Sequence, residues 1–160
     1  MLYQWPIALS LHQLGALIWV GGMFFAHFSL RPAATRLLDP PVRLPLMLAV
    51  FDRFFPFIWA SIAMLWGSGL WLFLVLSHGK AGPHVHAMMG IAAVMTVIFA
   101  FIWFQPYKRM KATVAAEKWA AAGISLALIR RLIATNLALG LATAILASAG
   151  PALLAVAGSS

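Results

Sequence analysis

Four long apolar stretches alternate with short polar ones along this chain. The first stretch contains no Lys, Arg, Asp or Glu, and at about 1.5 Å rise per residue it is long enough to cross a bilayer core of about 30 Å as a helix. The pattern predicts an all-α membrane protein, a four-transmembrane-helix bundle with one membrane domain over residues 1–160. The expected spans are residues 7–30, 54–77, 85–105 and 132–149.

Proline and glycine positions predict how the segments between the spans fold. The loop 31–53 carries four prolines, which limit any helix there to short pieces, one of them over residues 46–52. The loop 106–131 is rich in Ala and Lys after its first residue and favours a helix that runs into the fourth span, with Gly123 as its weak point. At the far end of the fourth span, Gly150 and the proline after it are expected to break or kink the helix.

Composition and charge distribution agree with a membrane protein. Apolar residues make up 64% of the chain and charged residues 9%, which is outside the range of soluble domains. The net charge of +8 would suggest a nucleic-acid partner in a soluble protein, but here every basic residue except Lys80 lies in the loops 31–53 and 106–131. By the positive-inside rule those loops are cytoplasmic and both termini lie outside the cytoplasm. The expected partner is the lipid bilayer, with no nucleic acid.

The residue types that are missing narrow the chemistry. Cysteine is absent, so there is no disulfide framework, thiolate metal site or cysteine nucleophile. The only acids, Asp39, Asp52 and Glu117, all lie in the basic loops, which excludes carboxylate acid–base chemistry within the bilayer. Histidine and methionine remain as metal ligands.

His12 lies near the outer end of the first span above a row of small side chains. On a helix it shares one face with Gly15, Ala16 and Trp19, because these residues follow it at spacings of three, four and seven. Such a shelf admits a flat ligand. For the glycines alone, close approach of another helix is the better explanation, because small residues commonly serve this purpose in membranes. It applies to Gly15, Gly21 and Gly22.

The third span repeats this arrangement around His86. Met89 and Gly90 follow it by three and four positions, and the first and third spans run in the same direction, so both histidines lie near the outer face. Neutral imidazole is a strong axial ligand of haem iron. We therefore expect a haem b between spans one and three, ligated by His12 and His86, with these neighbours lining it: Gly15, Ala16, Trp19, Met89 and Gly90.

Two other functions stay open at this point. Copper is the alternative metal, with His84 and Met88 as further ligands near the outer face, in a transport or copper-binding protein. The second is a structural or assembly subunit without its own cofactor. In the haem interpretation the function is membrane electron transfer or a haem-linked oxidoreductase reaction, and either a homo-oligomer or a membrane redox partner is compatible with it.

Several short motifs resemble the CopD-like (copper-resistance D) integral membrane family over nearly the whole chain. They are His12 with Trp19-Val20-Gly21-Gly22 and Leu30-Arg31-Pro32, then Arg53-Phe54-Phe55, Val85-His86-Ala87-Met88, Arg130-Arg131-Leu132-Ile133 and Asn136-Leu137-Ala138-Leu139-Gly140. The layout is also distantly similar to that of the HemJ four-span haem-binding membrane proteins. The resemblance implies a multi-pass protein of a bacterial-type inner membrane that handles copper or haem b.

Overall fold

The protein is a bundle of four long helical spans. The computed structural model describes residues 4–157, with side chains for all of them except 76 and 151–157. No strand occurs in that part of the chain, and all four spans are long and apolar enough to cross a membrane, which confirms the predicted fold class. In the labels that follow, η marks a π-helical segment. Span one consists of α1 (Gln4–Ala16), η1 (Leu17–Gly21), α2 (Gly22–Phe25), η2 (Ala26–Leu30) and α3 (Arg31–Leu37), and span two consists of α4 (Pro40–Trp71) and η3 (Leu72–Leu76). Span three consists of α5 (Pro83–Ile102), η4 (Trp103–Tyr107) and α6 (Lys108–Ala115), and span four is α7 (Trp119–Ala157).

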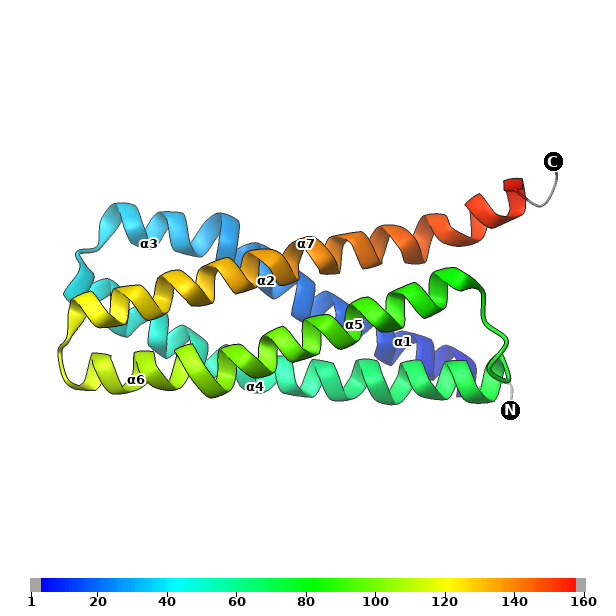
Figure 1. The fold of residues 1–160 in the computed structure, drawn as a ribbon, viewed down its shortest axis with the longest axis horizontal. Coiled ribbons are helices and arrows are strands. Elements are labelled where there is room, and N and C mark those ends of the chain that lie inside the picture. The colour runs from blue at the N-terminus through cyan, green and yellow to red at the C-terminus, as the bar shows by residue number, and fades with distance from the viewer. Residues whose placement is uncertain (1–3, 158–160) are drawn as a thin grey trace.

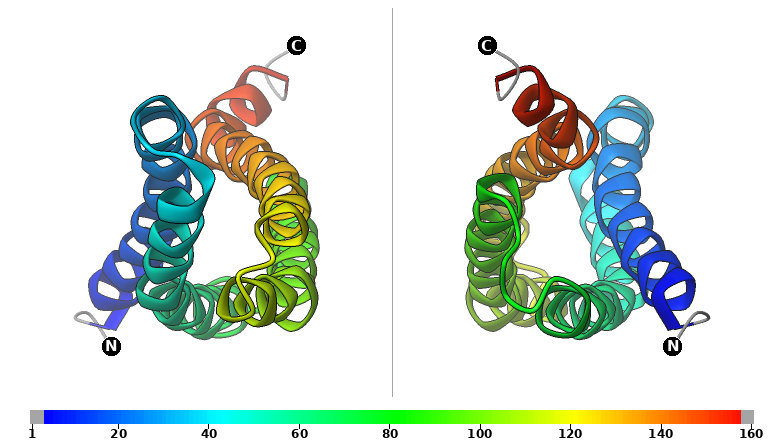
Figure 2. Two further views of the ribbon diagram at one scale, coloured as in Figure 1. Left: turned by 90° about the vertical axis from the view of Figure 1, so that its left-hand side faces the viewer. Right: turned by 90° about the vertical axis from the view of Figure 1, so that its right-hand side faces the viewer.

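The spans pack as two pairs. Helix α1 packs against α4 and α5 packs against α7, and the pairs meet through α4 and α7. Viewed end-on, the four spans surround one axis, with α1 and α5 on different sides of it (Figure 2). Both termini lie at one end of the bundle, and α3 and α6 lie at the other (Figure 1). We call the first of these the histidine end; the turn between η3 and α5 lies there as well. We call the second the basic end.

The large buried side chains are concentrated from the middle of the bundle to the basic end. Phe55 is at the centre, with its ring against those of Phe51, Phe99 and Tyr107 at centroid distances of 5.0, 5.3 and 5.0 Å. Toward the histidine end, only small residues are buried. In residues 4–16, 63–71, 83–94 and 141–150, these are Ala8, Gly15, Ser68 and Gly150. The bundle is therefore tightly packed at one end and loosely packed at the other.

The proline-rich segment 31–53 is more helical than predicted. Helix α4 starts at Pro40 and runs without a break through Pro45 and Pro56. A proline in the first turn costs little, because its missing N–H would have no helical partner there, but one in the helix interior costs about 3 kcal/mol. Burial of Leu44 and Met47 in the core offsets that cost. The prediction from proline positions did not take this burial into account.

The last two helices also differ from prediction in where they break. The interruption falls at residues 116–118, and Gly123 lies inside α7. Glu117 has a left-handed backbone (φ 54°), and the amides of residues 117 and 118 bond to the carbonyls of Val114 and Thr113, which is a Schellman ending for α6. Helix α7 continues past Gly150 to Ala157, so a break at that glycine is wrong, while a kink there stays a prediction.

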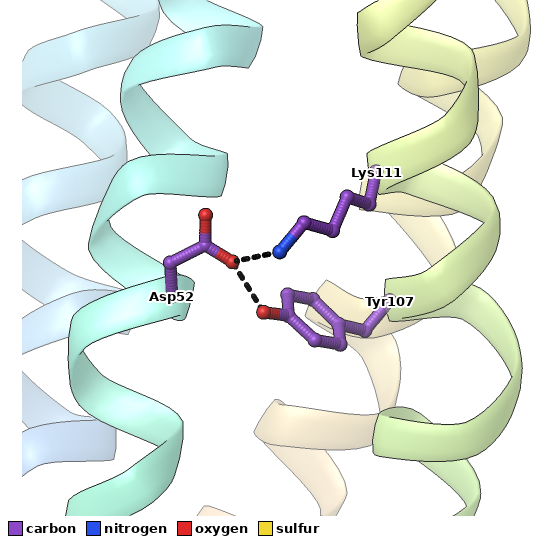
Figure 3. A network of polar contacts seen from close by, with 3 residues as sticks. All are labelled: Asp52, Tyr107 and Lys111. Atoms are coloured by element: carbon purple, nitrogen blue, oxygen red, sulfur yellow. Dashed lines mark hydrogen bonds and ion pairs between the residues drawn. The ribbon is translucent and has the colours of Figure 1, made fainter.

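Polar side chains connect the spans at several levels. At the basic end, the Tyr107 hydroxyl donates to the Asp52 carboxylate, and Lys111 Nζ lies 3.4 Å from the same oxygen (Figure 3). Near mid-bundle, Asn136 Nδ2 on α7 donates to the Met95 carbonyl on α5 at 3.0 Å. Toward the histidine end, the Trp66 indole N–H on α4 donates to the Thr96 hydroxyl on α5 at 3.1 Å.

Candidate functional site

His12 projects from α1 toward α4, where its ring is held by a short chain of hydrogen bonds. Its Nδ1 lies 3.1 Å from Oγ of Ser68, and the Leu65 carbonyl lies close to the ring as well. The single hydroxyl proton of Ser68 is donated to the Met64 carbonyl, so the hydroxyl oxygen acts as the acceptor for the imidazole. Neutral His12 therefore carries its proton on Nδ1, and the lone pair is on Nε2.

His86 is held in the same protonation pattern by a different acceptor. Its Nδ1 lies 3.3 Å from the Gly82 carbonyl, one turn earlier on the chain. A carbonyl oxygen only accepts, so Nδ1 is again the protonated nitrogen and Nε2 carries the lone pair. The exposed imidazole also meets the ring of Phe73 edge-on, with centroids 5.5 Å apart and the planes at 88°.

Both histidines contact the same stretch of span two. The His12 ring lies against Gly69, where an added Cβ would be 3.0 Å from its Cε1, and His86 contacts Phe73, four residues further along. Four residues correspond to about one helical turn, or about 6 Å along the axis. The two imidazoles thus approach a common support from α1 and α5, at neighbouring levels of the histidine end.

The small residues beneath His12 serve mainly to pack α1 on α4. Gly15 is buried, and a Cβ there would lie 3.1 Å from both the Leu65 side chain and the Ser61 carbonyl. Trp19 is 2% exposed and belongs to the core, where it meets the edge of Phe99, while Ala16 is half-buried. Of the two explanations for this glycine, close helix approach is the one that the structure shows.

The matching residues of α5 are more open. Gly90 is exposed, and an added Cβ would meet no atom within 4 Å. Met88 and Met89 are half-buried. His84 is turned onto α7, where a Cβ at Gly150 would lie 3.0 Å from its own Cβ. Its Nδ1 is buried and has no hydrogen-bond partner among the described residues.

The imidazoles do not form a cluster of the kind that binds a metal ion directly. In the described residues, no group of three or more His, Asp or Glu side chains is placed to hold a metal. His84 and His86 are two residues apart on a helix and so lie on different faces. At the histidine end, His12 and His86 each have Nδ1 hydrogen-bonded, His84 faces α7, and His78 lies in the exposed turn.

These features define a multi-pass, all-helical membrane protein with imidazole side chains gathered at one end of a four-span bundle. The chain matches no protein-family model, and no curated protein and no solved structure is significantly similar to it. The relation to the CopD-like and HemJ proteins stays a prediction from the motifs.

Sequence reasoning missed the residues of span two that support the site, Ser68, Gly69 and Phe73. A signal was present, because a hydroxyl between Gly67 and Gly69 is unusual inside an apolar span. Small and hydroxyl residues favour close helix contact and hydrogen bonds across helices. The sequence does not tell which helix packs against which face of span two, so the contact of Ser68 and Gly69 with His12 could not be assigned from it.

Proposed function

We propose that this protein binds a b-type haem at its histidine end and functions in electron transfer in the membrane. In this proposal, His12 and His86 would hold the haem iron, each through Nε2. The observation that carries it is that both imidazoles donate Nδ1–H to a fixed acceptor, which leaves Nε2 with the lone pair that iron binds. Bound haem would supply one-electron redox chemistry.

The number of available ligands favours haem over a bare copper ion. Iron in a porphyrin needs only one or two protein ligands, because the macrocycle supplies the others. A copper site built from protein alone would have to draw on methionine as well as histidine, because the described residues contain no group of three or more His, Asp and Glu side chains placed to hold a metal. The hydrogen bonds of Nδ1, from His12 to Ser68 and from His86 to the Gly82 carbonyl, also fit a ligand role, since ligating histidines usually have their second nitrogen hydrogen-bonded.

The packing at the histidine end is compatible with a large flat ligand. The segments of α1, α4, α5 and α7 at this end bury only small side chains, and Gly90 leaves the α5 surface open one turn from His86. Apolar and aromatic groups, including Phe73, would surround the ligand and keep water from the iron. Such surroundings are one of the means by which proteins tune haem.

The absorption spectrum of the purified protein tests the proposal. The wild type is expected to show a Soret band and the sharp reduced bands of a six-coordinate low-spin b haem. His12→Ala and His86→Ala should each lose the low-spin signature and much of the haem. Ser68→Ala, which removes only the acceptor for Nδ1–H of His12, should weaken haem binding about 10- to 100-fold while the ligand itself stays in place.

Two matched variants separate ligation from general damage to this end of the bundle. His84→Ala removes a neighbouring imidazole that faces α7, and His78→Ala removes one from the exposed turn; neither should change the spectrum. If His12→Ala and His86→Ala both retain an unaltered haem spectrum, the ligand pair is refuted. If the wild type is colourless and binds Cu(I) through His84, His86 and Met88, the copper function replaces this proposal.

The orientation of the protein is part of the same proposal. Helix α1 begins and α7 ends at the histidine end, away from α3 and α6 (Figure 1). By the positive-inside rule the basic end faces the cytoplasm, so we propose that the haem site lies near the outer face. A reporter fused after the last residue should be active only outside the cytoplasm, and activity only inside would reverse the placement.

A further inference from the structure

A cavity lies at the basic end of the bundle, remote from His12 and His86. It has a volume of about 370 Å³ and is enclosed by α3, the first turns of α4 and the first turns of α7. Three arginines line it, one from each of these helices: Arg31, Arg43 and Arg130. The other lining residues are Thr35, Pro40, Leu44, Met47, Trp119, Ala120, Gly123, Leu126 and Ala127.

The charge in this cavity is uncompensated. Arg31 is close enough to Arg43 and Arg130 for their positive charges to repel one another. All three are half-buried, no lining residue is acidic, and the single ion pair in the described part of the chain is between Lys111 and Asp52. Like charges brought together in a partly desolvated site destabilise one another unless an anion joins them.

Two helix N-termini add to the positive potential. Helix α4 begins at Pro40 and α7 begins at Trp119, and both residues line the cavity. The first turn of a helix has a partial positive charge, which favours anions. At α4 only this dipole contributes, because Pro40 and Pro41 have no N–H and the amides of Val42 and Arg43 bond to the Asp39 carbonyl. The cavity therefore combines three guanidinium groups with two helix dipoles of the same sign.

Membrane topology alone does not explain this convergence. The positive-inside rule requires basic residues in a loop, but it does not require them to face one another. Four other arginines of the same two segments follow the simple expectation, because they are exposed and outside the cavity: Arg36, Arg53, Arg109 and Arg131. Among the arginines of these two segments, only the three that line the cavity are partly removed from solvent.

We propose that this cavity is a binding site for a phosphate group. Guanidinium matches phosphate oxygens in pairs of parallel hydrogen bonds, and three guanidinium groups from three helices can surround one such group. The cavity also has an apolar floor, formed by Leu44, Met47 and Leu126. A phosphate can come from the headgroup of an anionic lipid, since basic pockets between spans at this side of a membrane bind such headgroups, or from a soluble phosphate compound.

The test uses the full-length protein in a neutral detergent, titrated separately with phosphatidylglycerol, phosphatidylcholine and inorganic phosphate. Bound lipid is counted by native mass spectrometry, and the melting temperature is followed in each titration. We expect phosphatidylglycerol to bind and raise the melting temperature while phosphatidylcholine does not. Stabilisation by inorganic phosphate alone, without preference for the anionic lipid, would assign the site to a soluble phosphate compound.

Variants connect the binding to the cavity. Arg31→Gln and Arg130→Gln should each weaken binding of the phosphate-bearing probe about tenfold or more, because each loses charged hydrogen bonds. Arg131→Gln, next in the chain but exposed, is the matched control and should bind as the wild type does. Arg130→Lys keeps the topology signal but loses the forked geometry, and should also bind more weakly.

Folding is monitored in the same experiment. Without phosphate or anionic lipid, Arg130→Gln should melt no lower than the wild type, since the substitution relieves repulsion. The proposal is overturned if no probe is bound more tightly than phosphatidylcholine. It is also overturned if Arg131→Gln weakens binding as much as Arg130→Gln, because the lipid would then respond only to the overall charge of this end.

Discussion

The contact between α1 and α4 leads to a quantitative prediction at Gly15. Replacing it by alanine adds a Cβ that would lie 3.1 Å from the Ser61 carbonyl oxygen, 3.1 Å from Leu65 Cγ and 3.4 Å from Met64 Cβ. The carbonyl belongs to the backbone of a buried turn of α4, so it cannot rotate away, and the helices must separate by a few tenths of an ångström. Overpacking of this kind costs about 1–3 kcal/mol, and the higher helix propensity of alanine returns about 0.5–1 kcal/mol.

The expected net effect of Gly15→Ala is a loss of about 1 kcal/mol in the free energy of unfolding, the difference between the midpoints of those two ranges. Gly90→Ala is the matched control, because it is also in a span and one turn from a histidine but meets no atom. It should be neutral or stabilise by up to about 1 kcal/mol. Reversible unfolding in mixed micelles measures both. If Gly15→Ala is as stable as Gly90→Ala, the close contact of α1 with α4 is wrong.

Three further substitutions test other parts of the fold by the same unfolding assay. Tyr107→Phe removes the hydroxyl that donates to Asp52 and should cost about 1.5 kcal/mol, the lower range for a bond to a charged partner; no loss would exclude that bond. Asn136→Leu should cost about 0.5–2 kcal/mol by releasing the Met95 carbonyl and should leave cofactor content unchanged, so loss of cofactor from a folded variant would contradict a purely structural role. Glu117→Gly should stabilise by about 1 kcal/mol, because glycine relieves the left-handed backbone at the end of α6, and a destabilised variant would argue against that backbone conformation.

The number of spans was predictable because bilayer crossing depends on local properties of the chain, namely apolar length and the absence of charge. The ends of the helices were less predictable. Pro45 lies inside α4 because burial of its neighbours outweighs the lost hydrogen bond, and burial depends on distant residues. The break at Glu117 has no glycine to mark it, whereas Gly123, which resembles a break, is inside a helix.

The candidate site shows the same division between local and distant information. His12 and His86 stand out in the sequence because imidazole is rare in apolar spans and both precede small residues. The direction of each ring depends on span two, through Ser68 and Phe73, and no periodicity reveals which helices are neighbours. The arginine cavity could not be predicted from the sequence for a further reason. Its three arginines satisfy the positive-inside rule whether or not they face one another.

The pairing of α1 with α4 and of α5 with α7 has a consequence for how the chain is made. Each pair is a helical hairpin that is contiguous in sequence. The turn 77–82, where His78 and Gly79 have left-handed backbones, is the covalent connection between the two hairpins. As synthesis proceeds, the first hairpin can enter the bilayer and form its own interface before the second leaves the ribosome. The protein should accordingly tolerate being divided in that turn: residues 1–79 and 80–160, produced as separate polypeptides in one cell, should assemble through the aromatic core into the complete four-span bundle.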